Sequence, residues 1–89
     1  MRDPINDDWS AATAIARTET VLSCARFAFD AWGRTGDEWW RCRAKSLSLL
    51  AGDWIVAIEY ALDRTCETAK RAERLSALLR PIRVRTDEA

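Results

Sequence analysis

Histidine is absent from this sequence of 89 residues, and cysteine occurs only three times. Its absence removes the commonest general base and a common metal ligand. Neither a glycine-rich phosphate loop nor a nucleophile elbow occurs. The three cysteines, Cys24, Cys42 and Cys66, stand far apart without a C-x-x-C motif, so we expect reduced thiols buried on helices. The sequence therefore predicts a protein that is not an enzyme, with no catalytic residues, no metal site and no cofactor.

A surplus of charge is also lacking, because 14 Lys and Arg residues balance 14 Asp and Glu residues. Such a balance predicts neither a uniform basic field nor an acidic tail, so nucleic acid is not expected as the main partner. Residues 64–85 are nevertheless locally basic, with only Glu67 and Glu73 as acids. A solvated helix face and a contact with phosphate or with an acidic partner both explain this segment.

No hydrophobic run is long enough to cross a membrane. The longest apolar stretch, LLAGDWIVAIEYAL at residues 49–62, contains Asp53 and Glu59, whereas a membrane-spanning helix needs about 20 mostly apolar residues. Residues 1–12 are polar and acidic, unlike a signal peptide. We therefore expect a cytoplasmic protein without a membrane span.

The apolar residues that are present recur at helical spacing. Their pattern predicts a polar segment at 1–8, a first helix at 9–32, a second helix at 37–80 and a tail at 81–89, all in one domain. Between the helices, in GRTG, Gly33 could close the first helix, and Thr35 with Glu38 has the spacing of a capping box. Pro81 is expected to end the second helix.

The predicted fold class is all-α, an antiparallel helical hairpin with coiled-coil-like heptad spacing and a long second helix. Gly52 and Asp53 leave two alternatives open: a continuous or kinked helix, or a break that gives a three-helix bundle. If the chain folds back at GRTG, one register pairs large residues with large ones and small residues with small ones. The predicted hairpin core is Ile15, Leu22, Phe29, Leu47 and Trp54, with Trp40 opposite Phe29.

A long second helix leaves apolar side chains uncovered, because the first helix is too short to reach beyond about residue 60. We expect this face to be covered by a second copy, as a dimer or a tetramer, or by another apolar surface. The predicted contact residues are Trp39, Trp40, Ile55, Val56, Tyr60 and Leu62.

Two segments resemble phasins, the proteins that coat polyhydroxyalkanoate storage granules in bacteria. AFDAWGRTGDEWWR, residues 28–41, resembles their tryptophan-containing helical region, and AIEYALDRTCETAKRAERLSALL, residues 57–79, resembles the aromatic-bearing helix that follows. The resemblance spans about residues 20–81. It departs from the family at Glu59, where a glutamine commonly precedes the aromatic. It implies a non-enzymatic, oligomer-forming protein with affinity for a hydrophobic polymer.

Three functions follow as hypotheses. The first is a self-associating helical protein that coats a polyhydroxyalkanoate granule. The second is a small helical adaptor or inhibitor that binds one protein through the apolar face of the second helix. The third, which the balanced charge favours least, is a nucleic-acid-associated helical dimer that uses residues 64–85.

Overall fold

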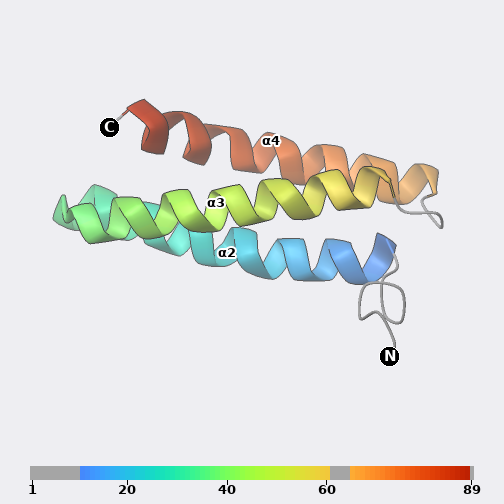
Figure 1. Ribbon diagram of the computed structural model, residues 1–89, viewed down its shortest axis with the longest axis horizontal. Coiled ribbons are helices and arrows are strands. Elements are labelled where there is room, and N and C mark those ends of the chain that lie inside the picture. The colour runs from blue at the N-terminus through green and yellow to red at the C-terminus, as the bar shows by residue number, and fades with distance from the viewer. Residues whose placement is uncertain (1–10, 61–64, 89) are drawn as a thin grey trace.

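The computed structural model describes residues 11–60 and 65–88, and these residues form three helices (Figure 1). They are α2 at Ala11–Thr35, α3 at Glu38–Glu59 and α4 at Cys66–Glu88. The chain runs along α2, back along α3 and then along α4 in the direction of α2 (Figure 1). The prediction of an all-α fold is confirmed, in its three-helix form. The predicted polar segment 1–8 and the contact residue Leu62 lie outside the described residues.

The turn between α2 and α3 depends on Gly36 and not, as predicted, on Gly33. Gly33 lies inside α2, whereas Gly36 has a φ of +69°, which glycine adopts without steric cost. The Gly36 N–H donates to the carbonyl of Trp32 at 2.8 Å and satisfies one of the last helical acceptors. The first helix is therefore three residues longer than predicted at this end.

The predicted capping box is wrong in its details, although a cap is present. Asp37 is the N-cap of α3, and its Oδ1 accepts a hydrogen bond from the Trp39 N–H at 2.9 Å. Thr35 instead donates to the Ala31 carbonyl of its own helix at 2.8 Å. The Asp37 carboxylate stabilises the positive, N-terminal end of α3. Because this cap sets where α3 begins, it also sets the position of Trp39 and Trp40 in the first turn.

The predicted second helix at 37–80 is wrong, because it is two helices, and the break does not fall at Gly52. Gly52 lies inside α3, which continues to Glu59. The next helix has its own start, since Thr65 and Thr68 cap one another. The Thr65 N–H donates to Oγ1 of Thr68 at 2.7 Å, and the Thr68 N–H donates to Oγ1 of Thr65 at 3.2 Å. This reciprocal pair meets the same need as a capping box.

Pro81 does not end a helix, as the sequence predicted, but lies inside α4. Proline in a helix interior costs about 3 kcal/mol, since it cannot donate and its ring crowds the preceding turn. Beyond Pro81, however, Ile82 and Thr86 are buried against the other helices. Continuing the helix buries both side chains, which offsets the cost of the proline, and Pro81 itself is exposed.

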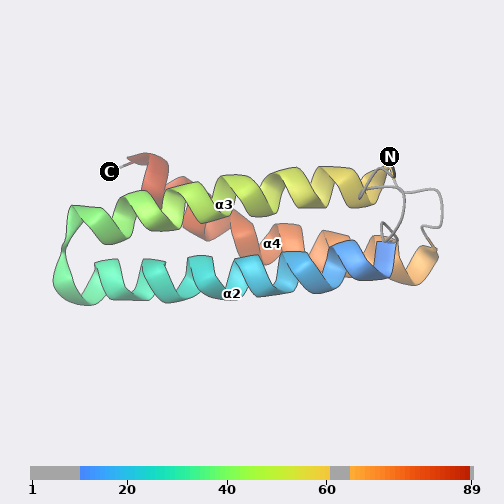
Figure 2. The ribbon, with the colours of Figure 1, turned by 60° about the horizontal axis from the view of Figure 1, so that its bottom comes forward.

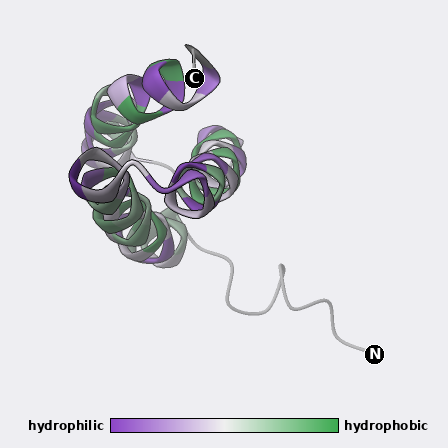
Figure 3. Cartoon of the chain, turned by 90° about the vertical axis from the view of Figure 1, so that its left-hand side faces the viewer, coloured by the Kyte–Doolittle hydropathy of each residue, from purple (hydrophilic) through white to green (hydrophobic). Residues whose placement is uncertain are grey.

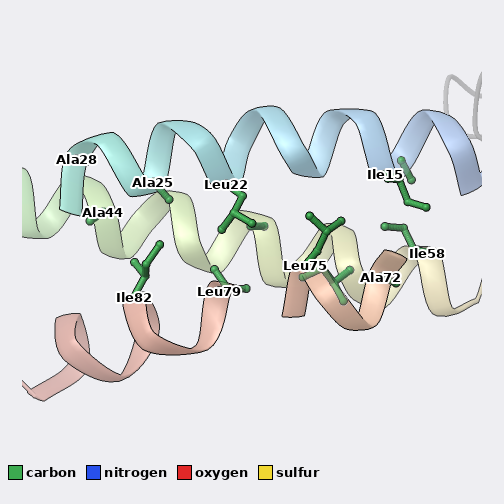
Figure 4. Close-up of a cluster of buried hydrophobic side chains, with 13 residues drawn as sticks. Ile15, Leu22, Ala25, Ala28, Ala44, Ile58, Ala72, Leu75, Leu79 and Ile82 are labelled. Carbon is green, nitrogen blue, oxygen red and sulfur yellow. The ribbon is translucent and has the colours of Figure 1, made fainter. Parts of the chain in front are cut away.

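The core is a stripe of small and branched side chains from all three helices (Figure 4). Figure 4 shows Ile15 of α2 facing Ile58 of α3, with α4 side chains closing the cluster below. Among the described residues, the three buried hydroxyl side chains donate within their own helices, for example Thr18 to the Ala14 carbonyl at 2.7 Å. The buried stripe of α3 is Ala44, Ser48, Ala51, Ile55 and Ile58, and that of α4 is Ala72, Leu75, Leu79, Ile82 and Thr86.

The predicted hairpin core is confirmed in part. Ile15 and Leu22 are buried, whereas Phe29, Leu47 and Trp54 are only partly buried at its edge. The reason is the third helix, because α4 packs against both α2 and α3 (Figure 2) and the shared core buries Ile55 and Ile58 of α3. Ile55, which the predicted hairpin left without cover, is therefore covered within the chain.

Candidate interaction surface

The two flanks of α3 differ in chemistry. On one flank, polar and small residues meet α4: Arg41 Nη1 donates to the Thr86 carbonyl at 2.9 Å, and Lys45 pairs with Asp87 at 3.6 Å. On the other flank, large aromatic side chains meet α2. Helix α3 thus lies between an ionic contact with α4 and an aromatic contact with α2.

Three aromatic rings cluster where α2 and α3 approach their connecting turn. Phe27 of α2 packs edge-to-face on Trp40 of α3, with ring centroids 5.8 Å apart. Trp40 in turn packs edge-to-face on Trp39 at 4.8 Å. Such pairs contribute about 0.5–1.5 kcal/mol beyond their buried area. Nevertheless Phe27 is 62% exposed and Trp39 is 60% exposed, so most of this cluster faces solvent.

The same flank continues along α3 away from the turn. Leu47, Leu50 and Trp54 are three and four residues apart, which places them on one side of the helix. Leu47 and Trp54 pack partly on the core, whereas Leu50 is exposed. The guanidinium of Arg17 on α2 lies over the Trp54 ring, 5.7 Å from its centroid. We call the whole flank the aromatic edge, defined as Phe27, Trp39, Trp40, Leu47, Leu50 and Trp54.

The structure separates the predicted contact residues. Trp39 belongs to the exposed part of the aromatic edge, and Trp40 is half-buried within it. Val56 and Tyr60 are 51% and 80% exposed, but they lie near the other end of α3. Trp39 and Tyr60 are 21 residues apart along the helix, which is about 31 Å. Instead of one surface, the predicted residues mark two.

Ile55 does not belong to either surface, contrary to the prediction. Only 6% of it is exposed, because α4 supplies the cover that the sequence assigned to a partner chain. It is a core residue in this arrangement. The reason is its register, since Ile55 follows Ser48 by seven residues on the buried stripe of α3.

The thiols are also placed differently from the prediction. Cys24, Cys42 and Cys66 are all free and exposed instead of buried. Each lies off the buried stripe of its helix, so none contributes to the core. Phe27 and Leu50 were likewise missed as surface residues. Phe27 lies two positions before Phe29, which is on the Ile15–Leu22–Phe29 stripe, so its departure from that spacing was the available signal.

An ion pair lies at the start of α3, beside the aromatic edge. Arg41 donates to the Glu38 carboxylate, and this hydrogen bond lowers the pKa of Glu38 and raises the pKa of Arg41. The same guanidinium holds the C-terminal part of α4 through the Thr86 carbonyl. The pair therefore connects the first turn of α3 to the last turns of α4.

In residues 11–60 and 65–88, no cluster of three or more His, Cys, Asp or Glu side chains could hold an ion. None of the described helices is long and apolar enough to cross a membrane.

A comparison with protein-family models, with curated proteins and with solved structures finds no match to this chain.

Proposed function

We propose that this protein is a non-enzymatic helical protein of the cytoplasm that attaches to a hydrophobic biopolymer through its aromatic edge. The observation that carries the proposal is the exposure of Phe27 and Trp39 on a cluster that two helices hold in place. The resemblance to phasins is the reason for naming a polyhydroxyalkanoate granule as the polymer.

The shape and energetics of the aromatic edge suit an extended apolar surface. It runs from the ring cluster near the turn to Trp54. The two helices that carry it, α2 and α3, are antiparallel (Figure 2). An aromatic side chain can bury about 150–250 Å². Covering the exposed parts of Phe27 and Trp39 would contribute about 5–8 kcal/mol at ~25 cal/mol per Å². Adsorption also leaves the core of the bundle intact.

Co-sedimentation with washed polyhydroxybutyrate granules tests this proposal. We expect saturable binding that persists as salt is raised, because apolar burial is not screened. The double variant Phe27→Ala/Trp39→Ala should weaken binding at least tenfold. The matched control is Leu78→Ala/Val84→Ala, which truncates two exposed apolar side chains on α4. Equal binding of the edge variant and the wild type would contradict the assignment.

We also propose self-association, through the second exposed surface of α3. Leu49, Val56 and Tyr60 recur at intervals of seven and four on the outward side of the helix, and all three are exposed. They remain uncovered after α4 has packed. Light scattering coupled to size-exclusion chromatography should give a dimer or larger for the wild type. The variant Val56→Asp/Tyr60→Asp should elute as a folded monomer, and an unchanged mass would exclude this surface.

A second candidate function is binding to one specific protein through the same aromatic edge. Its favouring observation is composition, since tryptophan and arginine are the residues enriched in binding hot spots, and Arg17 lies against Trp54. This adaptor or inhibitor would bind its partner at a fixed stoichiometry, independently of granules. A complex that forms with the wild type but not with Phe27→Ala/Trp39→Ala, together with no granule binding, would favour it.

A further inference from the structure

An excess of positive charge lies in the middle of α4, at residues 70–85. Residues 70–85 contain six basic residues, one Lys and five Arg, and Glu73 is their only acid. Residues 11–60, which form α2 and α3, contain six basic and six acidic residues. Helix α4 as a whole has a net charge of only +2, because Glu67, Asp87 and Glu88 flank these residues. The local positive field therefore lies over residues 70–85.

Most of these cations are free of partners within the described part of the chain. Arg71 pairs with Glu19 of α2 at 2.9 Å. No ion pair or side-chain hydrogen bond joins Arg74, Arg80, Arg83 or Arg85 to any described residue, and all four are exposed. The nearby carboxylate of Asp87 is paired with Lys45 of α3. A ligand would therefore not have to displace an internal ion pair from these four.

The packing of α4 explains why the arginines point outward. Its apolar stripe, from Ala72 to Ile82, is buried against α2 and α3, so the basic residues occupy the remaining arc. Figure 3 shows hydrophilic residues beside hydrophobic ones on the C-terminal turns of α4. From residue 70 to residue 85 the helix rises about 23 Å. The charges thus extend along the helix and around it instead of forming one pocket.

We propose that α4 binds the phosphate backbone of double-stranded DNA without reading its sequence. Five of the six cations are arginines, and a planar guanidinium group can bind two phosphate oxygens at once. A charge array about 23 Å long matches a continuous phosphate chain better than an isolated carboxylate of a protein. An anionic bilayer fits less well. The exposed large apolar residues of α4, Leu78 and Val84, are six residues apart and about 120° around the helix from each other. They form no face for insertion.

Fluorescence anisotropy of a labelled duplex of about 20 base pairs tests this inference on the full chain. Binding should be saturable at about 50 mM salt. With about three phosphate contacts, affinity should fall roughly 40-fold between about 50 and 200 mM salt, as counterions are released. Two duplexes of unrelated sequence should bind equally. Binding that is insensitive to salt, or absent at the lower salt concentration, would overturn the proposal.

Two variants with the same loss of charge make the test specific to α4. Arg74→Gln/Arg80→Gln/Arg85→Gln should abolish measurable binding or flatten its salt dependence. The control, Arg26→Gln/Arg34→Gln/Arg43→Gln on α2 and α3, should bind within about twofold of the wild type. Circular dichroism confirms that both are folded. An equal loss in the two variants would show a general charge effect and overturn the assignment.

Anionic vesicles containing phosphatidylglycerol complete the experiment. Vesicle binding tighter than duplex binding, lost in the α4 variant, would identify a membrane surface as the ligand and contradict the DNA proposal. Granule binding through the aromatic edge is measured separately, with the Phe27→Ala/Trp39→Ala variant. The two proposals can therefore fail independently.

Discussion

At the scale of single residues, Gly52 of α3 lies beside α4 with room for a methyl group. A Cβ at this position would lie 3.6 Å from Arg83 Nη1 and 3.9 Å from Leu79 Cδ2, which are ordinary contacts. The residue is helical, and alanine is about 1 kcal/mol better than glycine in a helix interior. We predict that Gly52→Ala stabilises the protein by about 1 kcal/mol and raises its melting temperature by about 4–8 °C. Thermal unfolding followed by circular dichroism measures this.

Gly36 supplies the control for that prediction. Its φ of +69° lies in the left-handed region, where a Cβ is strained even though nothing crowds it. Gly36→Ala should therefore destabilise the protein by about 1 kcal/mol, opposite in sign to Gly52→Ala. If both variants shifted the melting temperature in the same direction, the different roles of the two glycines would be wrong.

At the scale of elements, Pro81 lowers the stability of α4. It removes one helical hydrogen bond, and its exposed side chain contributes little to the core. We predict that Pro81→Ala stabilises the protein by about 1–3 kcal/mol, measured by urea unfolding. Pro81→Gly serves as the comparison, because it restores the donor with poorer helix propensity and should gain less. A loss of stability in Pro81→Ala would mean that a bend at Pro81 is needed for α4 to pack.

The contact between the start of α3 and the end of α4 should respond to acid. The hydrogen bond from Arg41 lowers the folded-state pKa of Glu38 below its ordinary value of 4.5. Its stabilising contribution is therefore present above that value and is lost as the pH falls through the lower folded-state pKa. NMR titration should place Glu38 below 4.5. In Glu38→Gln, stability should fall less steeply over this acid range, and an unchanged slope would contradict the role of the pair.

The parts of the fold that the sequence predicted follow from local signals, but the position of the break between α3 and α4 was missed although a local signal was present. The α2 stripe and the approximate start of α3 follow from heptad spacing and from the Asp37 cap, which are local. The split between α3 and α4 also had a local signal, the mutual cap of Thr65 and Thr68. Gly52 was the more conspicuous residue there, and it drew the predicted break to the wrong place.

The candidate surface was less predictable than the fold, for a physical reason. Exposure on α3 depends on where α4 packs, and heptad spacing within one helix does not set the register of a third helix against the other two. Ile55 was assigned to the surface because only α2 was available to cover it. Trp39 was correctly placed at the surface by adjacency alone, since neighbouring helical residues point about 100° apart and both tryptophans cannot enter one seam.

At the scale of the whole molecule, α4 completes the core. Ile55 and Ile58 of α3 and Leu22 of α2 belong to a cluster that Leu75, Leu79 and Ile82 close (Figure 4). We predict that a chain ending at residue 64 loses cooperative unfolding and binds the dye ANS, as exposed apolar surface does. The full chain is the control. A truncated chain that melts cooperatively at the same temperature would show that the α2–α3 pair is stable alone.

The alanines between α2 and α3 have a consequence for mutational tolerance. Ala14, Ala25, Ala28, Ala44 and Ala51 are buried with at most 1% exposure, and their small side chains let the two helices approach closely. Enlarging one of them would force the backbones apart, and overpacking typically costs about 1–3 kcal/mol. Such a separation would also pull Phe27 of one helix away from Trp40 of the other. These alanines therefore set the distance between the two helices that carry the aromatic rings. We expect homologous chains to accept fewer residue types at these five positions than at the exposed Trp39.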